Sequence, residues 1–231
     1  MFEGDIDMIA HETFPVRERS LMGRRSLMGA AILAAAAPLF AKAALADAAP
    51  AGAVATVQRF NDALLAALKA GKPAGFQGRY AILAPAVEQA FDLPSVLALS
   101  IGPRWASLPP DQQTRLLEAF RRYTVASYVA NFDNYTGQTF SVSPDARSLT
   151  AGEVVVRSRI ASASGSPTDL GYVMRQTPAG WKIVDVLADG SISRVAVQRS
   201  DFRSLLEHGG GEALEASLQR KTSSLSGGAL A

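Results

Sequence analysis

Residues 153–190 read "EVVVRSRIASASGSPTDLGYVMRQTPAGWKIVDVLADG" and decide the fold class. The apolar residues recur with a period of two, so Val154, Val156 and Ile160 share one face while Arg157 and Arg159 point to the other. The segments between these runs are rich in Gly, Pro, Ser and Asp, the residues that turns require. Strands are predicted at residues 153–161, 169–176 and 181–187, after a first strand at 138–143. Short strands joined by such turns favour an antiparallel meander of about four strands.

The residues before the sheet, about 55–134, have helical spacing. Phe60 and Leu64 lie four positions apart and so share one face of a helix. Asp92-Leu93-Pro94 is typical of a capped helix start with an early proline. Pro109-Pro110-Asp111 predicts a long helix that ends near Asn134.

A second helical region follows the sheet. After the turn at Gly190 the chain is predicted to be extended to about residue 200. Ser200-Asp201 is expected to cap a short helix to Glu207, and Gly209-Gly210-Gly211 to break it before a last helix at 212–221. The combination predicts an α+β fold in which helices pack on one face of a curved sheet.

The first 46 residues predict an export signal. Arg24 and Arg25 precede an apolar run at 27–40 and the small residues Ala44-Leu45-Ala46, which is the order of a secretory signal peptide. The paired arginines also fit a twin-arginine motif, so both export routes stay open. The predicted organisation is a leader at 1–46, one domain at 47–222 and a flexible tail at 223–231. Within the domain, the helical part covers about 55–134, the sheet part about 138–200 and the C-terminal helices about 201–222.

The composition excludes several classes of chemistry. The chain has 231 residues, no cysteine and two histidines. A disulfide scaffold, thiol catalysis and cysteine-ligated metals are therefore excluded. His208 is the histidine outside the leader, and a histidine at a helix end is usually a favourable cation there. A net charge of +2 does not indicate a nucleic-acid partner.

Few residues offer a catalytic arrangement. Asp185 shares strand parity with Trp181, Ile183 and Leu187, so its carboxylate is expected to point inward. Such a lone carboxylate is either a general base in a cavity or, more commonly, a hydrogen-bond acceptor for a neighbouring turn. Asp185, Asp189 and Asp201 are too loosely spaced to predict a divalent metal site. We therefore expect no enzyme, no metal and no cofactor, and an apolar cavity between helices and a concave sheet is feasible.

Two long stretches resemble a known family. They are "GPRWASLPPDQQTRLLEAFRRYTVASYVANFDNYTGQTFSV" at 102–142 and "WKIVDVLADGSISRVAVQRSDFRSLLEHGGGEALEASLQRK" at 181–221. Together they resemble the MlaC family of periplasmic lipid-binding proteins, which includes the toluene-tolerance relatives. The resemblance covers nearly all of residues 55–222, and the order of its motifs is more specific than any one of them. The turn at 189–193 departs from the family, which commonly has Glu-Gly-Val-Ser and one residue fewer.

The resemblance implies both a fold and a function. The fold would be an NTF2-like curved sheet with a helical subdomain that encloses an apolar pocket. The function would be a periplasmic carrier that binds acyl chains as the soluble component of an ABC transport system. Its partners would be a phospholipid, an inner-membrane transporter complex and an outer-membrane lipoprotein or equivalent acceptor. The stretch "DVLADGSISRVAVQRSDF" is more similar to the branch associated with hopanoid biosynthesis, which makes a hopanoid or other polycyclic lipid the alternative ligand.

Candidate lining residues follow from the parity of the predicted elements rather than from the family pattern. They are Tyr80, Leu83, Leu97, Ile101, Trp105, Phe120, Tyr123, Tyr128, Val156, Ile160, Tyr172, Met174, Ile183, Leu187 and Ile192. Two other functions remain open alongside the lipid carrier. A cavity enzyme on an NTF2-like fold would need polar residues that converge on Asp185. A binding protein for small polar solutes would usually be longer, with two lobes.

Overall fold

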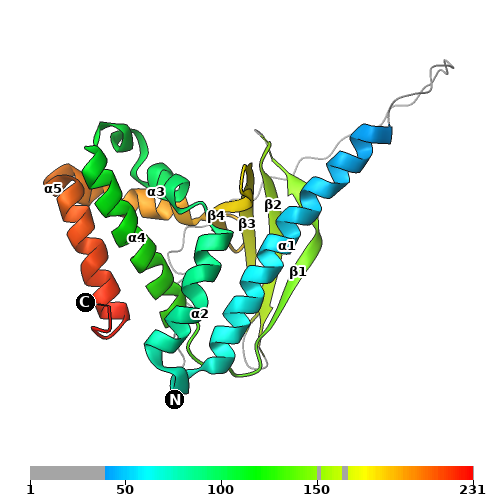
Figure 1. Ribbon diagram of the computed structural model, residues 1–231, viewed down its shortest axis with the longest axis horizontal. Helices are drawn as coiled ribbons and strands as arrows, with labels where there is room; N and C mark the ends of the chain where they lie inside the picture. The colour runs from blue at the N-terminus through cyan, green and yellow to red at the C-terminus, as the bar shows by residue number, and fades with distance from the viewer. Residues whose placement is uncertain (1–39, 150–151, 163–165, 231) are drawn as a thin grey trace, which may run out of the picture.

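An antiparallel sheet and a layer of helices face each other in the computed structural model, which describes residues 40–149, 152–162 and 166–230 (Figure 1). The sheet has the order β1-β2-β3-β4-β5, so each strand pairs with its neighbours in sequence. The predicted antiparallel meander and the α+β class are confirmed. The strands are β1 Thr139–Ser148, β2 Val154–Ala161, β3 Thr168–Thr177, β4 Gly180–Ala188 and the short β5 Ile192–Ser193.

Five α-helices pack on and beside the sheet, with α1 across it and α4 and α5 to one side (Figure 1). They are α1 Phe40–Ala70, α2 Gly75–Ala90, α3 Leu93–Ile101, α4 Pro110–Asn131 and α5 Arg194–Leu225, with 3-10 turns at Lys72–Ala74 and Gly102–Ser107. Helix α1 packs against β1, β2 and β4, and α2 lies between α1 and α4. Helix α4 packs chiefly on α5, α2 and α3, as Figure 1 shows for its long contact with α5. Within the described ranges, no helix has both the length and the apolar character that a membrane crossing requires.

The predicted leader lies outside the described residues except for positions 40–46, which belong to α1.

The helix starts that depend on local signals are confirmed. Asp92 caps α3, since its carboxylate accepts hydrogen bonds from the backbone N–H of Ser95 at 3.2 Å and from its hydroxyl at 2.6 Å. Helix α4 begins at Pro110, as Pro109-Pro110-Asp111 predicted. A proline inside a helical pattern usually marks a kink or a boundary. Pro85 does not end α2, which continues through it to Ala90.

The start of α5 differs from the prediction. The chain is helical from Arg194, six residues before the expected cap at Ser200, and the helix continues to Leu225. The cause is a cap built partly from the sheet. Asp185 Oδ1 accepts the backbone N–H of Val195 at 3.0 Å, and Ser193 Oγ accepts that of Ala196 at 3.0 Å. These acceptors satisfy first-turn amides that otherwise lack partners. The predicted break at the triple glycine is a kink at Gly210 (φ 64°, ψ −160°) inside this helix.

A bulge in β4 changes which side chains face the helices. Val173 pairs with Asp185 while Met174 pairs with Ile183, so Val184 is the extra residue. Ile183 therefore lies in the main core and Val186 packs against it, whereas Leu187 packs on the opposite face with Val155, Val173 and Val184. The prediction that Leu187 shares the inner face of Ile183 was wrong, because strict alternation does not hold across a bulge.

Candidate functional site

A cavity of about 130 Å³ lies between α4 and the inner face of β3 and β4. Helices α3 and α5 complete its walls, together with one residue of α1. Most of the lining is apolar or aromatic, and polar groups come mainly from α4 and α5. The lining residues are Leu64, Phe91, Leu93, Val96, Phe120, Tyr123, Thr124, Ser127, Tyr128, Asn131, Phe132, Leu170, Tyr172, Asp185, Val186, Arg194, Val195 and Gln198.

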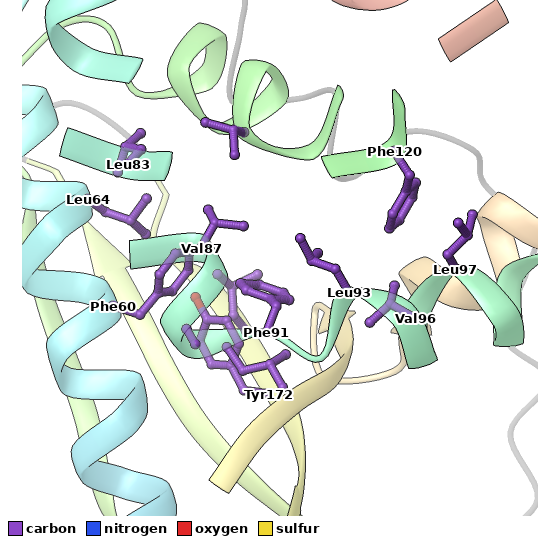
Figure 2. Packing of buried hydrophobic residues seen from close by; sticks show 14 of the residues in the cluster. Phe60, Leu64, Leu83, Val87, Phe91, Leu93, Val96, Leu97, Phe120 and Tyr172 are labelled. Carbon is purple, nitrogen blue, oxygen red and sulfur yellow. The ribbon is translucent and has the colours of Figure 1, made fainter. Parts of the chain in front are cut away.

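Three aromatic rings of the lining, Phe91, Tyr128 and Tyr172, pack around Phe60, which lies behind them. Phe60 of α1 meets Phe91 and Tyr128 edge-on, with ring centroids 5.2 Å apart in both pairs. Tyr172 of β3 lies edge-on to Phe60 at 6.2 Å. Figure 2 shows Phe60, Phe91 and Tyr172 grouped where α1 and the end of α2 meet the sheet. Edge-to-face pairs of this kind add to the energy of area burial, so they stabilise the packing of α1 and α4 on the sheet at this point.

The polar groups of the lining gather toward α5. Arg194 and Gln198 lie one helical turn apart on α5, and Asn131 lies at the end of α4. Arg194 is half-buried and forms no ion pair with any residue that the structure describes. Ser127 Oγ donates to the backbone carbonyl of Tyr123 at 2.8 Å, so this hydroxyl is already satisfied by its own helix. The lining is thus mostly apolar and aromatic, and Arg194 contributes a guanidinium to it.

Asp185 belongs to the cavity lining, but its oxygens are occupied. Oδ1 accepts the backbone N–H groups of Val186 at 2.8 Å and Val195 at 3.0 Å, and Oδ2 accepts the hydroxyl of Ser193. A carboxylate with these bonds holds the start of α5 against β4. Among the described residues, Asp, Glu and His side chains form no group of three that would hold a metal ion. His208 is exposed, and its ring nitrogen Nδ1 lies 2.8 Å from the carbonyl of Ser204.

The structure brings four of the fifteen predicted lining residues to the cavity: Phe120, Tyr123, Tyr128 and Tyr172. Six others are buried in the surrounding core: Leu83, Leu97, Ile101, Val156, Met174 and Ile183. Three more pack on that core from partly exposed positions: Tyr80, Trp105 and Ile160. The last two lie away from the cavity: Leu187 on the outer face of the sheet and Ile192, which is 38% exposed, in β5.

Several lining residues do not follow from the sequence pattern as interpreted above. Arg194, Val195 and Gln198 lie on one face of α5. Because an extended segment is predicted there, the sequence pattern does not identify this helical face. Ser127 and Asn131 continue the face of α4 that carries Phe120, at intervals of three and four. Both are polar, and a criterion based on apolar faces does not select them. The spacing on α4 is the signal that would have found them.

Comparison with known proteins places this architecture in a family. Residues 58–220 match the sequence profile described as MlaC protein. The chain belongs to the MlaC family. The match begins within α1 and ends within α5, so it includes every element that lines the cavity, and it confirms the resemblance seen in the sequence.

A solved structure shares the MlaC-family fold. It is the phospholipid-binding protein from Ralstonia solanacearum, determined in complex with a phospholipid. The two chains are 24% identical, the match covers 75% of this chain and 98% of the other, and the TM-score is 0.63. At this identity the likeness establishes the fold.

Proposed function

We propose that this protein is a lipid carrier that binds the acyl chains of a phospholipid in the cavity between α4 and the sheet. The observation that carries the proposal is the cavity itself. A mostly aromatic and aliphatic chamber, with the guanidinium of Arg194 in its lining, occurs in a chain of the MlaC family. The phospholipid bound by the Ralstonia protein of the same fold supports this choice of ligand. The occupied carboxylate of Asp185 weighs against the cavity enzyme.

The energetics explain why a carrier needs such a chamber. Hydrocarbon burial contributes about 0.8 kcal/mol per CH₂. A two-tailed lipid with roughly 30 such groups therefore resists transfer into water by on the order of 20 kcal/mol. A protein that moves this lipid through water has to cover most of its tails, and no catalytic group is needed to do so.

The cavity has to widen when lipid enters. Pockets for small organic ligands typically measure about 300–1,000 Å³, and this cavity measures about 130 Å³. Helix α4 packs mainly on other helices, so it can move away from β3 and β4 together with α3 and α5. The aromatic pairs between Phe60, Phe91 and Tyr172 join α1 and α2 to the sheet and would stay in place. We infer a closed state that opens along the boundary between α4 and the sheet.

The cellular setting is part of the same proposal. A leader at 1–46 would deliver the protein to the periplasm. There it would exchange lipid with an inner-membrane ABC transporter complex and an outer-membrane lipoprotein or equivalent acceptor. A hopanoid or other polycyclic lipid is the alternative ligand, favoured by the sequence at 185–202.

Extraction of labelled phospholipid from vesicles tests the proposal. The purified protein is mixed with vesicles that contain a fluorescent phospholipid, and the vesicles are then removed by flotation. We expect about one lipid per protein in the vesicle-free fraction. Ser127→Phe should abolish extraction, because the ring fills the cavity from α4. Ser127→Ala is the matched control and should extract normally. Equal extraction by both variants would place the lipid elsewhere, and no extraction by the wild-type protein would refute the carrier.

A further inference from the structure

Two tyrosine hydroxyls of the cavity lining have no hydrogen-bond partner among the described residues. Tyr172 of β3 is 1% exposed and lines the cavity. Its hydroxyl makes no hydrogen bond within the described part of the chain, and neither does that of Tyr128. Neither hydroxyl oxygen is among the fully enclosed side-chain atoms that lack a partner, so both reach open space, and Tyr128 is partly exposed. The open space beside these rings is the place from which a partner would come.

The two hydroxyl groups belong to one corner of the site. Tyr128 of α4 and Tyr172 of β3 both contact the ring of Phe60, at 5.2 and 6.2 Å between centroids. Burial raises the pKa of Tyr172 and of Tyr128 above the ordinary value, so both hydroxyls keep their protons. Each is therefore a hydrogen-bond donor that faces an apolar chamber.

Arg194 adds a cation to this arrangement. It lines the same cavity from the start of α5. Burial raises the pKa of the Tyr128 hydroxyl, and the positive charge of Arg194 lowers it to a smaller extent. The cavity thus presents a cation and two hydroxyl donors together with an apolar lining. A glycerophospholipid offers the matching groups: an anionic phosphate, two ester carbonyl oxygens and the hydrocarbon chains.

We propose that Tyr128 and Tyr172 donate hydrogen bonds to the ester carbonyl oxygens of the bound lipid, so that this protein selects acyl-ester lipids over ether-linked ones. The inference rests on the proposed function and names the linkage chemistry that the same cavity selects. An ether-linked lipid has the same head group and chains but lacks the carbonyl oxygens. A site with buried donors rejects a ligand without the matching acceptor, because the donors are then left unpaired.

A competition between two lipids tests this inference directly. Vesicles contain equal amounts of diester and diether phosphatidylglycerol with the same saturated chains, and the lipid bound after flotation is analysed by mass spectrometry. We expect the wild-type protein to hold the diester in about tenfold excess, the size of one to two net hydrogen bonds. Tyr172→Phe should reduce the ratio to about threefold, and the double variant Tyr128→Phe/Tyr172→Phe should bring it near one while ether lipid is still bound. Tyr135→Phe, at an exposed position away from the cavity, should keep the wild-type ratio.

The outcomes separate this inference from the proposed function. The ratio is measured within one sample, so a smaller folded fraction in a variant does not alter it. A wild-type ratio near one would overturn the selection and leave the carrier intact. A wild-type ratio that persists in the double variant Tyr128→Phe/Tyr172→Phe would overturn the assignment to these hydroxyls. If neither lipid is bound by the wild-type protein, the carrier fails, and the selection fails with it.

Discussion

Replacement of Asp185 by asparagine tests whether this carboxylate has a structural or a catalytic role. The side chain accepts two backbone N–H groups and one hydroxyl, and it joins β4 to the first turn of α5. Asparagine keeps the shape and one acceptor oxygen but removes the negative charge. Charge-assisted hydrogen bonds are stronger than neutral ones by about 1 kcal/mol each. An anion at a helix N-terminus contributes about 0.3–1 kcal/mol, and up to about 2 kcal/mol when partly buried.

We therefore expect Asp185→Asn to lower the free energy of unfolding by about 1–2 kcal/mol. For a domain of this size that loss lowers the Tm by about 2–8 °C. The assay is thermal and chemical denaturation followed by circular dichroism. Bound lipid should be unchanged in the folded variant.

Asp189→Asn is the matched control. Asp189 lies four residues on, is exposed and has a positive φ of 49°, a conformation that asparagine tolerates. Its stability should stay within about 0.5 kcal/mol of wild type. Residues kept for catalysis are often destabilising, so their removal tends to raise stability. A Tm for Asp185→Asn that equals or exceeds that of the wild type would refute the structural role of this carboxylate.

Three further substitutions test the packing that surrounds the site. In Gly52→Ala the new Cβ would lie 2.9 Å from Trp181 Cδ1, and this overpacking should lower the unfolding free energy by about 1–3 kcal/mol. It should also shift the fluorescence emission of Trp181, measured in a Trp105→Phe background. An unchanged spectrum would contradict the contact. Gly210→Ala places a side chain at φ 64° and ψ −160° and should cost about 1–3 kcal/mol, whereas Glu212→Ala, exposed beyond the kink, should change little. Asp92→Ala should lower the unfolding free energy by about 0.5–2 kcal/mol through loss of the α3 cap, and an unchanged denaturation midpoint would refute that cap.

Features with local causes were predictable from the sequence. The alternation in β2 predicted that Val156 faces the core and Arg157 faces solvent, because side-chain direction in a regular strand depends on the strand alone. The cap at Asp92 likewise needs only the three residues that follow it. The meander was predictable because its turns are short and rich in glycine and proline. The predicted strands brought Tyr172 to the cavity, whereas the other strand residues predicted to line it do not reach it.

Features that depend on distant parts of the chain were not predictable in this way. The side-chain direction of Leu187 depends on a bulge that exists only in the pairing of β3 with β4. The start of α5 depends on Asp185, a residue of another element. Arg194 was missed for that reason. Periodicity also shows that Leu83 and Leu97 are buried, but it does not show whether they fill the core or border an empty space. That difference depends on the volume left between packed elements.

The central claim is that the chamber between α4 and the sheet holds a two-tailed lipid. Mass spectrometry of an organic extract tests it most directly, with the protein purified without detergent from cells that express it with its leader. We expect close to one two-tailed lipid per protein in the wild-type extract and a strongly reduced amount in the extract of Ser127→Phe. An empty extract from folded, monodisperse wild-type protein that also takes up no lipid from vesicles would contradict the claim.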